Sequence, residues 1–158
     1  LAGDLMNRRF KRLGAAGYIL AVLVELARLQ APTLRYRTAQ IDAEPGDWRT
    51  EDLVMLSLCN SQFTGGAMQM APDAAIDDGL LDLVALHPMT RARFLGAFPR
   101  IFRGTHPVLD EITVSRAARV ELDLPGPVDV MIDGEVAKLT LQSVTVKRHA
   151  LEVLCPGT

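Results

Sequence analysis

Two short acidic segments of the chain carry the residue types that phosphate and metal chemistry require. The first contains Asp77-Asp78-Gly79, which places two carboxylates beside a flexible residue. Hard cations such as Mg²⁺ and Ca²⁺ take carboxylate, carbonyl and water oxygens as ligands. The segment could therefore bind a divalent cation. A solvent-exposed turn is the alternative, because Asp-Gly is among the commonest turn dipeptides.

The second segment is Ile132-Asp133-Gly134-Glu135, roughly 55 residues further along the chain. A carboxylate at a strand end can orient a hydroxyl group and accept its proton. A surface carboxylate on a hairpin is the alternative for Glu135. Asp133 would then point to the opposite face, because neighbouring residues of a strand alternate.

The order of these motifs resembles that in one family of enzymes. The second domain of lipid kinases related to diacylglycerol kinase and sphingosine kinase carries an Asn before a Gly-Gly pair, then a Pro, then Asp-Gly-Leu-Leu, and later Asp-Gly-Glu. Matching residues occur here in the same order, and an N-terminal basic-Gly-Tyr pattern adds support: Lys11, Gly14, Tyr18, Asn60, Gly65, Gly66, Pro72, Asp78–Leu81 and Asp133–Glu135. The Gly-Gly pair alone fits a β-bulge equally well.

The resemblance implies a role for each acidic segment. It implies that Mg²⁺ is bound by the side chain of Asp78 and the main-chain carbonyls of Ala75 and Leu80. It implies that Glu135 is the base acting on the lipid hydroxyl. In this family ATP is held mainly by an N-terminal domain with a Gly-Gly-Asp-Gly-Thr loop, and that sequence does not occur here.

We therefore expect residues 1–158 to form a single C-terminal lipid kinase domain without its ATP-binding domain, inactive on its own. The expected partners are a membrane lipid substrate, the protein's own N-terminal domain and, as a candidate, a second copy of the chain. We expect no nucleic acid partner, and a cytoplasmic location peripheral to the inner face of the membrane. Two other hypotheses stay open: a non-catalytic β-sandwich that binds lipid or protein, and an NAD kinase-like enzyme.

The composition is that of a folded domain. Apolar residues make up 49% of the 158 residues, charged residues 23%, and the net charge is −2. Such a balance argues against disorder and gives no overall basic excess for nucleic acid. The basic residues that open the chain indicate either a solvated helix face or a patch for anionic lipid: Arg8, Arg9, Lys11 and Arg12. Two cysteines without metal-ligand spacing favour a reducing compartment.

Hydrophobic periodicity predicts a mainly β (α+β) fold, a two-layer β-sandwich with N-terminal helices and one further helix. Helices are expected over 4–13, over 18–29 and over 90–103, where Pro99 predicts a kink or an early end. Leu124-Pro125-Gly126-Pro127 is expected to be a hairpin connection. Strands are expected over 33–41, 53–58, 80–86, around 114, and over 120–124, 128–132, 136–141, 144–146 and 151–154.

Overall fold

The computed structural model of the protein describes residues 30–151. Strands dominate the described range, and helical turns occur only between the fourth and fifth strands. The elements are β1 (Thr33–Ala39), β2 (Arg49–Asp52), β3 (Met55–Cys59), β4 (Leu81–Leu86), α3 (Arg91–Ala97), the 3₁₀-helices η2 (Phe98–Arg103) and η3 (His106–Val108), β5 (Ile112–Ala117), β6 (Arg119–Asp123), β7 (Val128–Ile132), β8 (Glu135–Leu139) and β9 (Ser143–Thr145).

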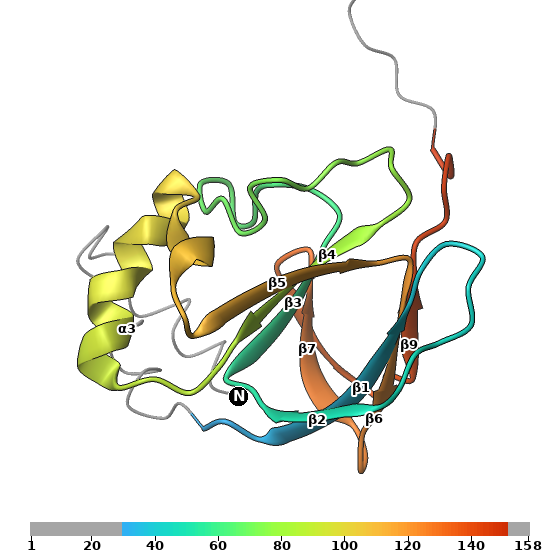
Figure 1. The fold of residues 1–158 in the computed structure, drawn as a ribbon, viewed down its shortest axis with the longest axis horizontal. Coiled ribbons are helices and arrows are strands. Elements are labelled where there is room, and N and C mark those ends of the chain that lie inside the picture. Colours follow the sequence, from blue (N-terminus) through green and yellow to red (C-terminus); the bar gives the residue numbers. More distant parts are fainter. Residues whose placement is uncertain (1–29, 152–158) are drawn as a thin grey trace, which may run out of the picture.

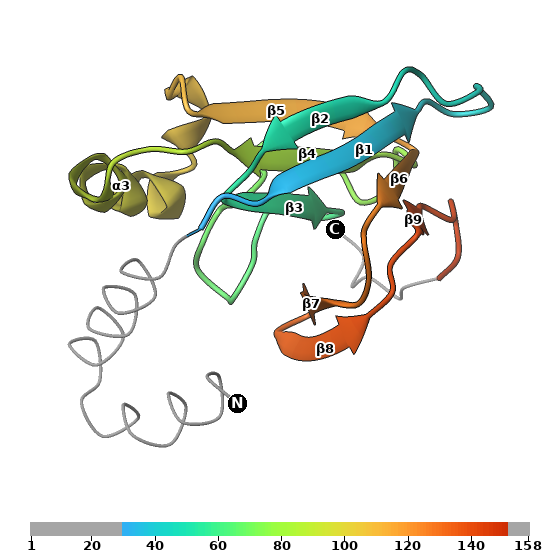
Figure 2. The ribbon, with the colours of Figure 1, turned by 90° about the horizontal axis from the view of Figure 1, so that it is seen from below.

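The strands form two antiparallel sheets and one hairpin. One sheet has the order β2-β1-β6-β9, the other has the order β3-β4-β5, and β7 pairs with β8. Figures 1 and 2 show the two sheets lying over one another, while the β7–β8 hairpin extends away from the sheet of β3, β4 and β5. The predicted mainly β sandwich with one further helix is confirmed. The predicted N-terminal helices and nearly all of the last predicted strand lie outside the described residues.

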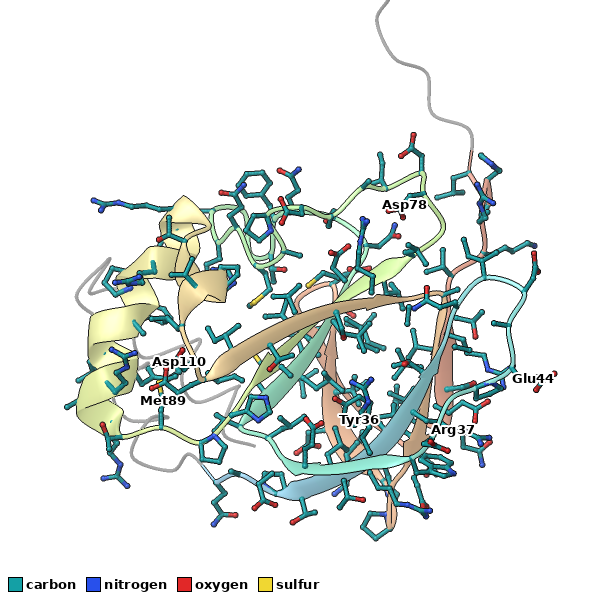
Figure 3. The ribbon with its side chains drawn as sticks, in the orientation of Figure 1. Tyr36, Arg37, Glu44, Asp78, Met89 and Asp110 are labelled. Carbon is teal, nitrogen blue, oxygen red and sulfur yellow. The ribbon has the colours of Figure 1, made fainter. Side chains whose placement is uncertain are left out.

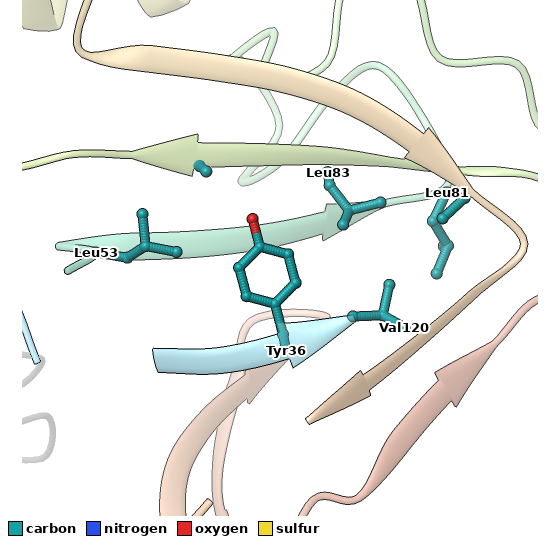
Figure 4. Close-up of a cluster of buried hydrophobic side chains, with 7 residues drawn as sticks. Tyr36, Leu53, Leu81, Leu83 and Val120 are labelled. Atoms are coloured by element: carbon teal, nitrogen blue, oxygen red, sulfur yellow. The ribbon is translucent and has the colours of Figure 1, made fainter. Parts of the chain in front are cut away.

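The core fills the space between the two sheets. Tyr36 of β1 and Val120 of β6 meet Leu81 and Leu83 of β4, as Figure 4 shows, with Leu53 at the edge of the cluster. Alternate residues of a strand point to opposite faces, so the first, third and fifth residues of β4 face this core together. These large side chains are buried almost completely, which supplies the main apolar contribution to stability.

Strand β4 is also covered on its other face. Val84 points away from the first core and packs against Met70, Ala71 and Ala74 of the irregular segment between β3 and β4. All six residues of β4 are buried in consequence. A continuous apolar run is typical of a strand covered on both faces, and it makes β4 the central element of the domain.

The helix predicted over 90–103 is present but changes type half-way. Thr90 caps its start, because the Oγ1 atom accepts a hydrogen bond from the Arg93 N–H at 3.2 Å. Pro99 has no N–H to donate and its ring crowds the preceding turn, so the chain continues as the 3₁₀-helix η2. Gly104, with φ of 62°, ends it.

One predicted connection is wrong. The segment 124–127 joins β6 to β7, but those strands lie in different sheets and do not pair. The hairpin turn is Asp133-Gly134, whose φ angles of 48° and 89° match the two-residue turns that suit the twist of paired strands. Asp133 is therefore a turn residue and does not lie on a strand face opposite Glu135. The strand predicted over 53–58 is present as β3 (Met55–Cys59), and Leu53 and Val54 separate it from β2, which lies in the other sheet.

Candidate functional site

Asp78 lies in the turn that leads into β4. Its Oδ1 atom accepts a hydrogen bond from the Leu80 N–H at 2.8 Å, which closes the turn locally. Its Oδ2 atom accepts a hydrogen bond from the guanidinium of Arg116 at 2.6 Å. Figure 3 shows Asp78 at the rim of the molecule, where the loop turns back toward the sheet. The turn fixes the position of the Asp78 carboxylate, and Arg116 of β5 supplies the positive charge that pairs with it.

A polar row crosses the outer face of the three-stranded sheet next to this turn. Cys59 of β3, Asp82 of β4 and Arg116 of β5 lie directly opposite one another in the register of the strands. The Arg116 Nε atom lies 3.3 Å from Asp82 Oδ1, so one guanidinium contacts both Asp78 and Asp82. The row therefore connects the turn that carries Asp78 to the buried centre of the sheet.

Asp82, the acidic residue of this row, is buried, with 2% of its surface exposed. Burial raises the pKa of its carboxyl above the ordinary value of 3.8, although the nearby Arg116 acts in the opposite direction. Its Oδ2 atom has no hydrogen-bond partner among the residues that the structure describes. A buried carboxylate with one unsatisfied oxygen makes Arg116 its principal stabilising neighbour.

Gly79 allows the turn to pass closely beneath another side chain. Its φ angle is +77°, and a Cβ atom at this position would lie 2.5 Å from the Cδ atom of Arg148. A side chain here would meet both a backbone penalty and a collision. Arg148 therefore packs its aliphatic stem on the turn, beside the predicted metal-binding residue.

The oxygens around Asp78 suit a hard cation in type. An ionised carboxylate can accept about four hydrogen bonds, so the two donors bonded to Asp78 leave acceptor capacity. Main-chain carbonyls such as those of Ala75 and Leu80 are ligands of the same hard class. However, no group of three His, Cys, Asp or Glu side chains that could hold a metal ion occurs in residues 30–151. Any cation here would thus have fewer than three such side chains as ligands, with Asp78 already paired with Arg116, and would depend on main-chain oxygens as well.

Glu135 is the first residue of β8 and pairs with Ile132 across the hairpin. It is exposed, and its carboxylate makes no hydrogen bond or ion pair with other described residues. Its neighbours Met131, Ile132 and Val136 are also exposed, so the hairpin presents apolar side chains around the acid. Glu135 and Asp78 lie on different elements, and no hydrogen bond or ion pair joins them within the described part of the chain. The separate roles predicted for the two residues stay predictions.

Sequence reasoning missed three residues of this region. Asp82 could have been found from the sequence, because it is a charged residue within the apolar run of β4. Arg116 could not, because its role depends on the register of β5 against β4. Nothing in the sequence pointed to His106 either, although it is buried and its ring Nε2 lies 2.9 Å from the Met70 carbonyl oxygen. Burial lowers the pKa of His106 below the ordinary value of 6.5, because desolvation disfavours the charged ring.

The Gly-Gly pair also has a definite structural role. Gly65 and Gly66 form the turn of a small loop closed by paired hydrogen bonds between Thr64 and Met68, at 2.8 and 3.2 Å. The loop is tied to η2 by the Gln69 N–H, which donates to the Ile101 carbonyl at 2.9 Å. The pair therefore shapes the cover over one face of β4.

Comparisons with known proteins identify similar chains. Residues 1–155 match the family described as the YegS C-terminal NAD kinase beta sandwich-like domain. A diacylglycerol kinase of Mycobacterium tuberculosis is 33% identical, with 99% of this chain and 48% of that protein covered. A diacylglycerol kinase of Bacillus subtilis is 28% identical, with 99% and 50% covered. The chain spans about half the length of these curated relatives.

The fold comparison agrees. A crystal structure from Bacillus anthracis str. Sterne, described as a candidate diacylglycerol kinase, matches with a TM-score of 0.55 and 19% identity, covering 81% of this chain and 41% of that one. A likeness at this identity shows the shared fold alone. Within the described residues, no helix is long and apolar enough to cross a membrane.

Proposed function

Because the chain belongs to the YegS C-terminal NAD kinase beta sandwich-like family, we propose that it is the C-terminal domain of an ATP-dependent lipid kinase. The proposed reaction transfers the γ-phosphoryl group of ATP to a lipid hydroxyl, such as that of diacylglycerol. The observation that carries the proposal is the similarity to the Mycobacterium tuberculosis diacylglycerol kinase over 99% of this chain. The names of the relatives favour the lipid branch over an NAD kinase-like activity.

In the proposed reaction Glu135 takes the proton of the lipid hydroxyl. The hydroxyl oxygen forms a bond to the γ-phosphorus, the bond from that phosphorus to the bridging oxygen breaks, and ADP leaves. The exposed carboxylate at the start of β8 has no competing partner among the described residues, which leaves it available as an acceptor. The exposed apolar side chains beside it suit the approach of a lipid.

Asp78 is the proposed side-chain ligand of Mg²⁺, with the carbonyls of Ala75 and Leu80. Bound Mg²⁺ would supply positive charge that neutralises the phosphate oxygens. Arg116 supports this role by fixing the position of the Asp78 carboxylate, although it also competes for the same oxygen. ATP itself would be held mainly by an N-terminal domain, which places the active site between the two domains.

The test is a kinase assay on the full-length protein with labelled ATP, Mg²⁺ and a panel of lipids. We expect phosphorylation of a lipid alcohol, and we expect Glu135→Gln to lower kcat by about 10²–10⁴-fold, the usual contribution of a general base. Asp133→Asn is the matched control, because it removes a carboxylate from the same turn. A Glu135→Gln enzyme with the wild-type rate would refute the assignment of the base.

A second pair of variants tests the metal site. Asp78→Asn should raise the Mg²⁺ concentration needed for half-maximal rate, whereas Asp77→Asn, at the exposed neighbouring position, should not. Because Asp78→Asn also weakens the contact with Arg116, the free energy of unfolding is measured for both variants. An unchanged Mg²⁺ dependence in a folded Asp78→Asn protein would exclude Asp78 as a ligand. Failure of every lipid in the panel would refute the proposed function itself.

A further inference from the structure

The segment between β4 and β5 carries exposed apolar and exposed basic side chains close together in the sequence. Residues 91–103, which form α3 and η2, contain four arginines and no acidic residue. None of the residues of α3 or η2 is buried. Leu95 and Phe102 are 43% and 44% exposed, and Val108 of the adjoining η3 is 74% exposed. We call the surface formed by α3, η2 and Val108 the Arg-Phe face.

The inner side of this segment is fixed to the domain, so the outer side keeps a defined position. Ile101 packs against the second core cluster, and its carbonyl accepts the hydrogen bond from Gln69. The rings of Phe94 and Phe98 stack at 5.9 Å between centroids, and Phe98 meets Phe102 edge-on at 5.7 Å. These ring contacts connect the half-buried Phe94 of α3 with the exposed Phe102.

The charges of the Arg-Phe face are only partly neutralised. Arg93 pairs with Glu111 of the loop before β5 at 3.0 Å. Arg100 and Arg103 have no ion-pair partner within the part of the chain that the structure describes, and both are exposed. Figure 1 shows α3 and η2 at the end of the molecule opposite β9, and Figure 2 agrees, so the face is not covered by either sheet.

From this combination we propose that the Arg-Phe face docks on the surface of an anionic lipid bilayer. Aromatic and aliphatic side chains on one side of a helix enter the boundary between headgroups and acyl chains, and arginines among them pair with anionic headgroups. The occupant is a membrane because a protein partner would need acidic groups complementary to Arg100 and Arg103, whereas an anionic bilayer offers them at every position of a fluid surface.

This inference rests on the proposed function only in the identity of the partner. Asp78 lies toward the other end of the molecule from α3 (Figure 3), so the Arg-Phe face is an anchor and does not itself present the lipid to Asp78. An anchor of this kind raises the concentration of the enzyme at the surface that contains its substrate. Its loss should therefore affect reaction on bilayers more than reaction on dispersed lipid.

The experiment measures co-sedimentation of the full-length protein with vesicles of phosphatidylglycerol and phosphatidylcholine, and with vesicles of phosphatidylcholine alone. We expect tighter binding to the anionic vesicles. Removing two charges with Arg100→Gln and Arg103→Gln should weaken that binding about tenfold or more, given about 1 kcal/mol for each arginine and 1.4 kcal/mol for each factor of ten. Leu95→Ser with Phe102→Ser should weaken binding to both kinds of vesicle.

Matched controls remove the same groups elsewhere on the surface. Lys138→Gln with Lys147→Gln removes two exposed charges, and Ile41→Ser with Val114→Ser removes two exposed apolar side chains. Thermal unfolding of each variant shows that it is folded. Equal binding by wild type and the Arg-Phe variants would overturn the proposal. An equal loss in the lysine controls would also overturn it, because the attraction would then be unspecific.

The same variants separate this proposal from the kinase function. Activity is measured on a short-chain diacylglycerol dispersed in detergent and on the same lipid in vesicles. If the Arg-Phe variants keep the wild-type rate in detergent and lose rate on vesicles, both proposals stand. Vesicle binding without any kinase activity would refute the kinase function and leave the docking face. Kinase activity with unchanged vesicle binding in the variants would refute the docking face alone.

Discussion

The guanidinium of Arg116 lies directly across the strand pair from Asp82, and its Nε atom is 3.3 Å from the Asp82 carboxylate. Arg116 is partly exposed, with 42% of its side chain accessible, whereas the Asp82 side chain is almost fully buried. The pair thus extends from solvent into the sheet. Since the same guanidinium also contacts Asp78, the stability of β4 and the geometry of the candidate metal turn depend on one side chain.

Arg116→Met should destabilise the domain by about 1–2 kcal/mol, because it leaves the buried carboxyl of Asp82 without its partner, while the 42% accessibility of Arg116 weakens the pair through solvent screening. The double variant Arg116→Met, Asp82→Asn should lose less than the sum of the two single changes. The free energy of unfolding by urea for all four proteins measures this coupling. Strict additivity would show that the 3.3 Å contact contributes nothing to stability.

Asp82 should make stability depend on pH with a definite sign. Its pKa in the folded protein is raised above 3.8, so the folded state holds this proton at pH values where the unfolded chain has released it. Stability contributed by Asp82 is therefore present at low pH and is lost as the pH rises from about 3.8 through the raised pKa. The difference in unfolding free energy between wild type and Asp82→Asn, followed from about pH 4 to about pH 7, should shift in that direction. A difference that stays constant over this range would contradict the assignment.

His106 should make stability depend on pH in the opposite direction to Asp82. Its pKa in the folded protein lies below the ordinary value of 6.5, so the unfolded chain binds the proton first as the pH falls. Titration of His106 therefore costs no stability well above pH 6.5, and the free energy of unfolding declines as the pH falls through and below that value. His106→Gln keeps an amide donor for the Met70 carbonyl and removes the titration. Urea unfolding at about pH 7.5 and about pH 5.5 should show a smaller pH effect in this variant than in wild type.

Gly79→Ala should cost more stability than the same change at another positive φ angle. Gly134 is the matched control, because its φ is +89° and a Cβ atom added there would have no neighbouring atom within 4 Å. Gly134→Ala should lose about 1 kcal/mol from backbone strain alone. Gly79→Ala adds the collision with Arg148, so a second change, Arg148→Ala, should bring its loss down toward that of Gly134→Ala. If Arg148→Ala gives no relief, the close packing of this side chain on the turn is refuted.

The strands were predictable where local pattern decides them. The apolar run ending at Leu86 and the alternation beginning at Thr33 predict β4 and β1 almost to their bounds. Pro99 correctly predicted a change within the helix. The Leu124–Pro127 connection failed because a Pro-Gly turn fixes only a local reversal. Which strands then pair depends on contacts far apart in the chain, such as those of Val120 of β6 with the first core cluster.

For the site, the acidic residues could be chosen from the sequence, whereas their neighbours in space could be seen only in the structure. Asp78 and Glu135 stand out by residue type and by neighbouring glycines. The contact of Asp78 with Arg116 requires strand register, which links residues 38 positions apart. The isolation of Glu135 on a separate hairpin follows from the turn at Asp133 and could have been expected from the Asp-Gly dipeptide.

Strand β4 is covered on both faces and paired on both edges, and this limits which parts of the domain can move. Its amide hydrogens can exchange with solvent only when the whole domain opens, so they should be the slowest to exchange. The Asp78 turn continues directly into this strand and shares its rigidity at one end. Under the proposed function, movements that admit and release the lipid would come from other parts of the domain, such as the β7–β8 hairpin, which pairs with no third strand among those described.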